Sequence, residues 1–331
     1  MRYARIEGLH KDISKLVFGT ATPKLFAAAA PNAGKRERDE AFALLDQVYA
    51  SGINTFDCAA HYGEEITGAW MDERGVRDSC VVITKCAHPN AWRTRVNDFD
   101  ILSDAHDSLA KLKTSCIDIY MLHRDDRTVP VGRIVDTMNR LFDEGKVKIF
   151  GGSNWTHQRL EEANEYAAKN HLEPFRVSSP NFGLAEQVND PWRCDARFGD
   201  GCVTISGPGN AGARRWYADH KMPVFAYSSL ARGLFSGAFT SDDPEKAKQI
   251  MDAPGILGYY CPSNIERLRR CELLAKKKGI TVAQAAMAWI FHQKFEVFAL
   301  SSPVTPEQIR QNIEALDIAL TEEETAWLNL L

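Results

Sequence analysis

The 331-residue chain is 44% hydrophobic, which supplies enough apolar side chains for the core of one large barrel or of two ordinary domains. Its 40 basic and 44 acidic residues give a net charge of −4, and without a strong basic field we exclude nucleic acid as a partner. No apolar stretch approaches the roughly 18 residues of a membrane-spanning helix, and residues 1–15 carry no apolar run of signal-peptide length. We therefore expect a cytoplasmic protein without a membrane partner.

Short β-rich runs alternate with amphipathic patterns along the chain, which predicts a parallel sheet with helical crossovers. The predicted strands are Lys15–Gly19, Asn54–Asp57, Val81–Lys85, Ile117–Leu122, Lys148–Gly152, Phe175–Ser179, Pro223–Ala226 and Val297–Ser301. The predicted helices are Asp39–Ala50, Glu64–Glu73, Ile101–Lys113, Val131–Glu144, His157–Lys169, a region including Arg214–His220, Ile265–Lys278 and Thr281–Gln293.

Eight such units predict the α/β class and a (β/α)8 TIM barrel, formed by residues 1–331 as a single domain. A doubly wound open sheet is the alternative, but no GxGxxG motif follows the first strand. The stretch Gly183–Met222 is rich in Gly, Asp and Asn and is too long for an ordinary connection. It predicts an elaborated active-site loop between strands 6 and 7.

The eight cysteines are scattered without CxxC spacing, and we interpret them as reduced, mostly structural thiols. His61, Cys86 and His88 could approach one end of the predicted barrel. Their spacing matches no known ligand pattern, so we predict that the protein holds no metal.

Polar side chains follow several predicted strands at the barrel end where active sites are found. Asp57 follows the second strand, Tyr62 lies in the loop after it, Lys85 ends the third and His123 follows the fourth. Each alone has a structural explanation, such as a helix cap or rim packing. Together they converge, because neighbouring barrel strands would bring all four to one mouth.

The four residue types suit proton transfer. A tyrosine can act as a general acid near neutral pH only if its pKa, about 10 when unperturbed, is lowered. A nearby Lys85 would lower it by favouring the phenolate, and Asp57 would keep that lysine charged and oriented. His123 could donate a hydrogen bond to a substrate carbonyl oxygen.

The segments FDCAAHYG, VVITK, IDIYMLHRDD, GKVKIFGGSNW and FAYSSLARGLFSG resemble the successive signatures of the aldo-keto reductases, in the right order along nearly the whole chain. The resemblance implies a nicotinamide-dependent oxidoreductase that interconverts a carbonyl and an alcohol. It implies Asp57, Tyr62, Lys85 and His123 as the catalytic residues, with Tyr62 as the general acid and base.

The resemblance also implies NADP(H) as cofactor, with NAD(H) possible. The implied cofactor contacts are Gly19, Thr20, Ser153, Asn154, Ser179, Tyr227, Ser228, Leu230, Arg232, Ser302, Gln308, Gln311 and Asn312. The sequence departs from the family pattern at two of these cofactor contacts. Ser179 stands where glutamine is frequent beside the nicotinamide carboxamide, and LSSPVTPEQIRQN lacks the usual Gly followed by Lys or Arg, so that a clamp for a 2′-phosphate is not obvious.

The substrate is predicted to be a small polar or sugar-like aldehyde or ketone, contacted by His88, Trp92, Arg124 and Trp155. The two tryptophans have loop packing as an equal alternative. Two other functions stay open. Lys85 could form a Schiff base as in an aldolase, or the barrel could bind cofactor as a regulatory subunit without turnover.

Overall fold

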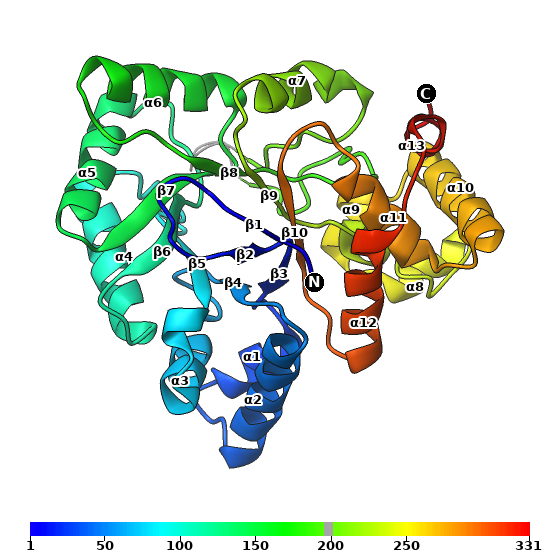
Figure 1. Cartoon of the computed structure of the whole chain (residues 1–331), viewed down its shortest axis with the longest axis horizontal. Coiled ribbons are helices and arrows are strands. Elements are labelled where there is room, and N and C mark those ends of the chain that lie inside the picture. The colour runs from blue at the N-terminus through cyan, green and yellow to red at the C-terminus, as the bar shows by residue number, and fades with distance from the viewer. Residues whose placement is uncertain (195–200) are drawn as a thin grey trace.

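The computed structural model describes residues 1–194 and 201–331. Eight parallel strands close into a barrel in the order β10-β3-β4-β5-β6-β7-β8-β9, with helices around the outside (Figure 1). The barrel strands are β3 (Leu16–Gly19), β4 (Thr55–Asp57), β5 (Val81–Cys86), β6 (Ile117–Leu122), β7 (Val147–Ser153), β8 (Val177–Ser179), β9 (Val224–Ala226) and β10 (Val297–Ser301). The predicted (β/α)8 TIM barrel is confirmed.

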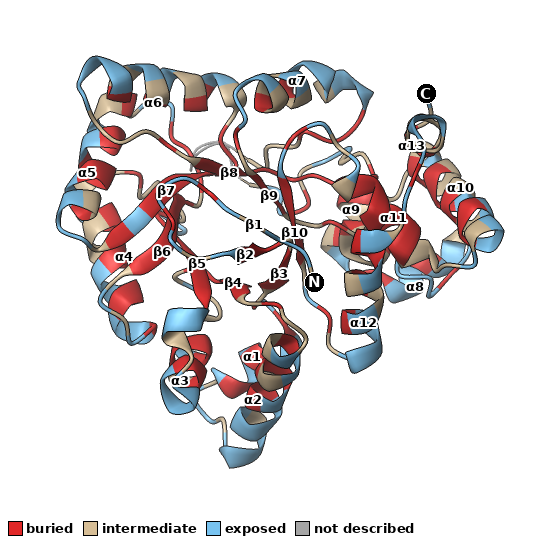
Figure 2. Ribbon diagram, in the orientation of Figure 1, coloured by how far each residue is buried: buried red, intermediate tan, exposed pale blue. Residues whose placement is uncertain are grey.

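Most helices bury one face and expose the other (Figure 2). They are α1 (Pro23–Ala28), α2 (Lys35–Ala50), α3 (Glu64–Arg74), α4 (Asp98–Lys111), α5 (Val131–Asp143), α6 (His157–Lys169), α7 (Ala211–Asp219), α8 (Ala247–Ile250), α9 (Ala253–Tyr259), α10 (Pro262–Lys278), α11 (Val282–Phe291), α12 (Pro306–Glu314) and α13 (Glu322–Leu328). Helix α2 begins four residues before its predicted start, because the Glu37 carboxylate accepts from the Gly34 N–H at 2.9 Å and caps an earlier turn.

The predicted loop between the sixth and seventh barrel strands, β8 and β9, contains α7; its residues 195–200 lie outside the described part of the chain. A second elaboration, with α8 and α9, follows β9 and was not predicted. Its helices are only four and seven residues long, too short to produce a clear amphipathic pattern.

An antiparallel pair, β1 (Tyr3–Ala4) and β2 (Ile13–Ser14), precedes the barrel and was also not predicted. Ile6, Leu9 and Ile13 belong to the same apolar cluster as the side chains inside the barrel. This segment therefore closes the end of the barrel at which the strands begin, and the opposite end is left for a site.

The inward face of the barrel follows the two-residue period of a strand. On β5, Val81 and Ile83 lie in the interior apolar cluster, and Lys85 continues the same row. On β6, Ile119 and Met121 lie in that cluster, and His123 is the next position on that face. Polar residues thus replace apolar ones where the strands end. Among the described residues, no helix combines the length and apolarity needed to cross a membrane.

Candidate active site

Each barrel strand contributes one inward-facing residue at or just beyond its carboxyl end. In strand order from β3 to β10 these are Gly19, Asp57, Lys85, His123, Ser153, Ser179, Tyr227 and Ser302, and all of them line one cavity of about 1060 Å³. The four predicted catalytic residues are brought together here, because Tyr62 lines the same cavity.

Tyr62 is held by a tight turn between β4 and α3. Ala59 and Tyr62 exchange backbone hydrogen bonds of 2.9 and 3.0 Å, and α3 starts two residues later. Gly63 makes the turn possible: its φ is +79°, and a Cβ there would lie 1.9 Å from Oγ1 of Thr20. A side chain at position 63 would therefore clash with Thr20 and strain the turn that carries Tyr62.

Lys85 is the centre of the hydrogen bonds among these residues. Its Nζ donates to Oδ1 of Asp57 at 2.6 Å, to the carbonyl oxygen of Cys58 at 2.8 Å and to Oη of Tyr62 at 3.1 Å. Asp57 and Lys85 are both buried, at 5% and 3% exposure. A buried charge of this kind is tolerated because the partner charge and the carbonyl satisfy it.

The neighbouring charges set the pKa of Lys85, whereas burial raises the pKa of Asp57. Burial lowers the pKa of Lys85, but the charges of Asp57 and Tyr62 and its hydrogen bonds to both outweigh burial, so that the net pKa is raised. A lysine held in its ammonium form is a poor nucleophile, which argues against a Schiff base at this position.

The pKa of Tyr62 is raised, whereas the sequence predicts a lowered one. Burial raises it to about 12, and the charge of Lys85 and the hydrogen bond from Lys85 only partly oppose that effect. The predicted influence of Lys85 is present, yet burial of the phenol is stronger.

Three histidines gather beside Tyr62. The ring centroids of His61 and His88 are 4.6 Å apart, those of His88 and His123 4.8 Å, and those of His61 and His123 5.2 Å. Burial, with the nearby charges of Lys85 and Arg124, lowers the pKa of His61 to about 4 and that of His123 well below its usual value. The rings are therefore neutral near pH 7.

The cluster could bring three nitrogens to a cation, since one ring nitrogen from each histidine lies within 4.8 Å of the others. Cys86, the third residue of the predicted trio, is not part of it; its Sγ lies 3.5 Å from the carbonyl oxygen of Met121. The two cationic side chains that lower the histidine pKa values also oppose a bound metal ion. The absence of a metal stays a prediction.

Most of the predicted cofactor residues line the same cavity: Gly19, Ser153, Asn154, Ser179, Tyr227, Ser228, Leu230, Arg232, Ser302, Gln308, Gln311 and Asn312. Thr20 does not; it points away from the barrel interior, and its Oγ1 donates to the carbonyl oxygen of Asp57 at 2.7 Å. Asn154 has φ +57° and accepts from Oη of Tyr227 at 2.7 Å, which joins the ends of β7 and β9 on either side of β8.

The segment after β9 is strained where it lines the cavity. Ser228, Ala231 and Arg232 have φ of +57°, +50° and +52°, a left-handed conformation that costs non-glycine residues free energy. Successive backbone turns of this kind can direct N–H groups at an anion. The Arg232 guanidinium is held beside the segment by an ion pair with Asp252.

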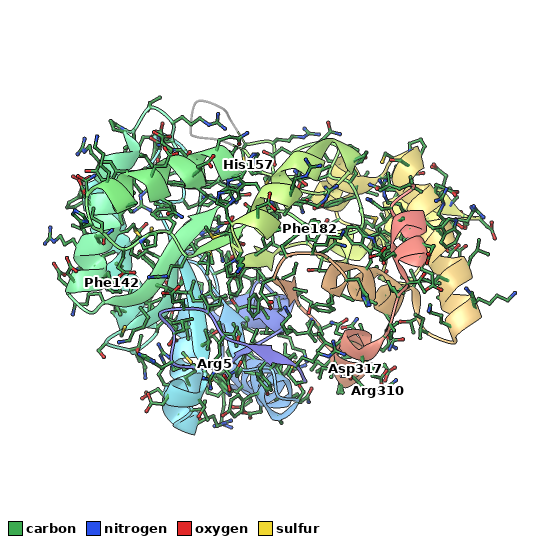
Figure 3. All side chains as sticks on the ribbon, turned by 45° about the horizontal axis from the view of Figure 1, so that its top comes forward. Arg5, Phe142, His157, Phe182, Arg310 and Asp317 are labelled. Carbon is green, nitrogen blue, oxygen red and sulfur yellow. The ribbon has the colours of Figure 1, made fainter. Side chains whose placement is uncertain are left out.

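The far end of the cavity, beyond β10, lacks a free cation among the described residues of Ser301–Asn312. Arg310, the only base in that range, is ion-paired with Glu307 and Glu314 and does not line the cavity. Figure 3 shows its side chain at the outer edge of the molecule. The predicted lack of an obvious 2′-phosphate clamp agrees with this geometry.

The four predicted substrate residues separate into two pairs. His88 and Arg124 line the cavity. Trp92 is 82% exposed and lies outside the lining, and Trp155 is fully buried, with its ring 5.0 Å from Phe175. The Trp155 indole N–H donates to the carbonyl oxygen of Arg124 at 3.3 Å. Trp155 therefore fits the packing alternative, whereas Trp92 is too exposed for packing and does not line the cavity. The substrate role of all four residues stays a prediction.

Sequence reasoning did not identify some residues that line the cavity. These are Trp192, Arg193 and Cys194, from the long loop after β8. His61, which the sequence placed at this end of the barrel only as a possible metal ligand, stacks on His123 and also lines the cavity. The composition of that loop predicted its role, but no spacing in the sequence indicates which of its side chains turn inward.

The sequence model of the aldo/keto reductase family matches residues 15–185 and 210–329. The chain belongs to this family. Aldo-keto reductase str7 of Strobilurus tenacellus is 28% identical over 302 residues, which cover 88% of this chain and 81% of the relative. Aryl-alcohol dehydrogenase GME11368 of Pestalotiopsis microspora is 26% identical over 306 residues, covering 88% and 72%. The aldo/keto reductase described here is thus an NAD(P)-dependent oxidoreductase.

The same fold is seen in a solved aldo-keto reductase of Klebsiella pneumoniae in complex with NADPH. The two structures agree with a TM-score of 0.69 at 24% identity, and the match covers 100% of this chain and 95% of that one. At this identity the likeness establishes the barrel and its closure, and the chemistry rests on the residues of the site itself.

Proposed function

We propose that this aldo/keto reductase interconverts a carbonyl and an alcohol by hydride transfer with NADP(H), with Tyr62 as the general acid and base. The observation that carries the proposal is the chain of hydrogen bonds from Asp57 through Lys85 to the Tyr62 hydroxyl at the mouth of the barrel. A buried phenol beside a compensated ammonium is suited to releasing and recovering a proton.

The bound nicotinamide would supply the hydride. In the chain itself, Tyr62 gives its proton to the carbonyl oxygen; a pKa raised to about 12 by burial keeps that hydroxyl protonated at neutral pH. Transfer stays favourable because the alkoxide being formed is a stronger base than a phenolate. The Lys85 ammonium, 3.1 Å away, then stabilises the phenolate. His123, neutral because burial lowers its pKa, can donate its N–H to the same oxygen.

The cavity wall fits a dinucleotide. Ser153, Asn154 and Ser179 offer hydroxyl and amide groups near the catalytic residues, and the left-handed backbone around Ser228 suits a pyrophosphate. The Klebsiella pneumoniae neighbour binds NADPH, which supports NADP(H). Because Arg310 is ion-paired with Glu307 and Glu314, it is not free to bind a 2′-phosphate. The preference for NADP(H) over NAD(H) should therefore be modest.

The substrate is proposed to be a small, polar or sugar-like aldehyde or ketone. The part of the cavity around Tyr62 is bounded by His61, His88, His123 and Arg124, so hydrogen-bonding groups dominate the wall where the carbonyl would sit. Such a wall favours an oxygenated ligand over an apolar one, because an apolar ligand would leave buried polar groups without partners.

A panel of carbonyls and polyols with each nicotinamide cofactor tests the function. Reduction with a cofactor deuterated at the transferring position should place one deuterium on the former carbonyl carbon, detectable by mass spectrometry. Cofactor binding without turnover across the panel would overturn the proposal and favour the regulatory barrel.

A further inference from the structure

Arg124 is a buried cation for which residues 1–194 and 201–331 provide no ion pair with a carboxylate. It is 5% exposed and lines the cavity, and its Nε is buried without a hydrogen-bond partner in the described part of the chain. Its Nη1 donates to Sγ of Cys202 at 3.4 Å. A guanidinium with one weak sulfur acceptor and an unsatisfied N–H is costly to bury, so its position requires a reason.

The backbone of Arg124 is fixed from the outer side of the barrel. Its carbonyl oxygen accepts from the Trp155 indole, and that ring lies fully buried against Phe175. The next residue, Asp125, is ion-paired with Arg159. The backbone from which the guanidinium extends into the cavity is therefore held in place.

Arg124 lies on the substrate side of the site. It follows β6, which is four strands from β10 in either direction round the ring, so it is opposite the end at Ser301–Asn312. It is next to His123 in sequence. Burial is the main cause of the lowered pKa values of His61 and His88, and the charge of Arg124 is a further cause. Two other arginines line the cavity: Arg232 is ion-paired with Asp252, and Arg193 is exposed and therefore not buried beside Tyr62.

The Sγ atom of Cys202 accepts the hydrogen bond that the Arg124 guanidinium donates. The hydrogen bond from the Cys194 thiol, and then the charge of Arg124, lower the pKa of Cys202 to about 7. The two cysteines are held near each other because the Asp190 carboxylate accepts from both of their backbone N–H groups, at 3.1 and 3.4 Å. Cys202 thus occupies one N–H of the guanidinium as a weak sulfur acceptor, which an acidic ligand could replace.

From this geometry we propose that the physiological substrate carries an anionic oxyacid group, a carboxylate or phosphate, which binds the Arg124 guanidinium while the carbonyl faces Tyr62 and His123. The inference rests on the proposed function and narrows its substrate class. A carboxylate would satisfy the free Nε–H together with an Nη–H in the paired geometry that arginine favours.

The test compares matched carbonyls that differ in one charge. 4-Carboxybenzaldehyde is paired with its methyl ester, and glyceraldehyde 3-phosphate is paired with glyceraldehyde, so the two pairs separate carboxylate from phosphate. We expect kcat/KM to be higher for the anion of at least one pair. Arg124→Gln should lower kcat/KM for that anion by about 10- to 100-fold, mostly through KM, with a much smaller change for its neutral partner.

Two controls keep the result specific. Arg215→Gln removes an exposed arginine that does not line the cavity and should change neither member of the pair by more than a few fold. Arg124→Lys, which keeps the charge but loses the paired geometry, should recover part of the anion preference. Unfolding by urea should show that each variant is folded.

Calorimetric binding of 4-(hydroxymethyl)benzoate gives a readout independent of turnover and should be lost in Arg124→Gln. Equal kcat/KM for both members of each pair in the wild type, or equal losses for both members in Arg124→Gln, would overturn the proposal. If no carbonyl is reduced at all, the proposed function fails instead, and retained binding of this benzoate by Arg124→Gln would still reject the role of Arg124.

Discussion

The Lys85 ammonium lies 3.1 Å from the Tyr62 hydroxyl and donates a hydrogen bond to it. The same nitrogen lies 2.6 Å from the buried Asp57 carboxylate, so the positive charge is balanced by a neighbouring negative one. The phenol therefore faces a cation that is fixed in place and already compensated. This arrangement allows a charge to appear on Tyr62 during reaction without a large rearrangement of the site.

Tyr62→Phe should lower kcat for carbonyl reduction by about 100-fold or more, because the ring remains and only the proton donor is removed. Cofactor affinity, measured by fluorescence titration, should stay within a few fold of the wild type. Tyr217→Phe is a matched control: that buried tyrosine bonds to Ser178 at 2.9 Å and does not line the cavity, so its loss should leave kcat near the wild-type value. Wild-type turnover by Tyr62→Phe would exclude this tyrosine as the donor.

Lys85→Met should lose both activity and stability. The variant leaves Asp57 buried without its counter-ion, which should cost about 3–5 kcal/mol in the free energy of unfolding by urea. The double variant Asp57→Asn/Lys85→Met removes both charges and should recover much of that stability while staying inactive. Wild-type protein treated with a carbonyl compound and borohydride should carry no adduct on Lys85; an adduct would support the aldolase alternative.

The barrel and its catalytic residues were predictable because they follow local rules. Strand periodicity alone places Lys85 in line with Val81 and Ile83, and His123 in line with Met121, so a polar residue at the end of an inward-facing row is already a candidate in the sequence. Parallel strands then bring those row ends together at one mouth.

The remaining features depend on contacts between distant segments. Arg124 meets Cys202 across 78 positions, and no pattern in the sequence relates these two residues. The sign of the Tyr62 pKa shift depends on how deeply the phenol is buried, which only the packed structure determines. The β1–β2 pair was missed for a similar reason, because two-residue strands are too short to show a period.

Trp155→Ala and Trp92→Ala should differ sharply in their effects on the free energy of unfolding and on KM. Trp155 is fully buried against Phe175 and supports the backbone of Arg124, so its truncation should cost about 3–5 kcal/mol of unfolding free energy and raise KM through the displaced arginine. Trp92 is 82% exposed, and its truncation should change stability by less than about 0.5 kcal/mol. Urea unfolding and steady-state kinetics measure both. A raised KM for Trp92→Ala without loss of stability would restore that ring as a substrate contact.

The cavity histidines should make the fold sensitive to acid. Burial lowers the pKa of His61 from 6.5 to about 4, and it lowers the pKa of His88 as well. Between about pH 6.5 and pH 4 the unfolded chain therefore binds protons that the folded protein does not, so stability falls as pH falls through this window. The urea midpoint should drop less between pH 7 and pH 5 in His61→Asn/His88→Asn than in the wild type. His10→Asn, which removes an exposed histidine outside the cavity, should follow the wild type, and identical slopes for all three proteins would contradict the assignment.

The preference for NADPH over NADH should be below about a thousandfold, a difference of about 4 kcal/mol. A 2′-phosphate is normally met by a free arginine or lysine, but Nε of Arg310 donates to Glu307 at 2.9 Å and its Nη1 is paired with Glu314. The start of α12 offers little in its place, since the N–H groups of Val304 and Gln308 already donate to the side chains of Gln308 and Thr305. Fluorescence titration of both reduced cofactors measures the ratio, and Arg310→Gln should leave it within about twofold because that guanidinium does not reach the cavity. A selective loss of NADPH affinity of tenfold or more in Arg310→Gln would mean that Arg310 leaves its two glutamates to bind the phosphate.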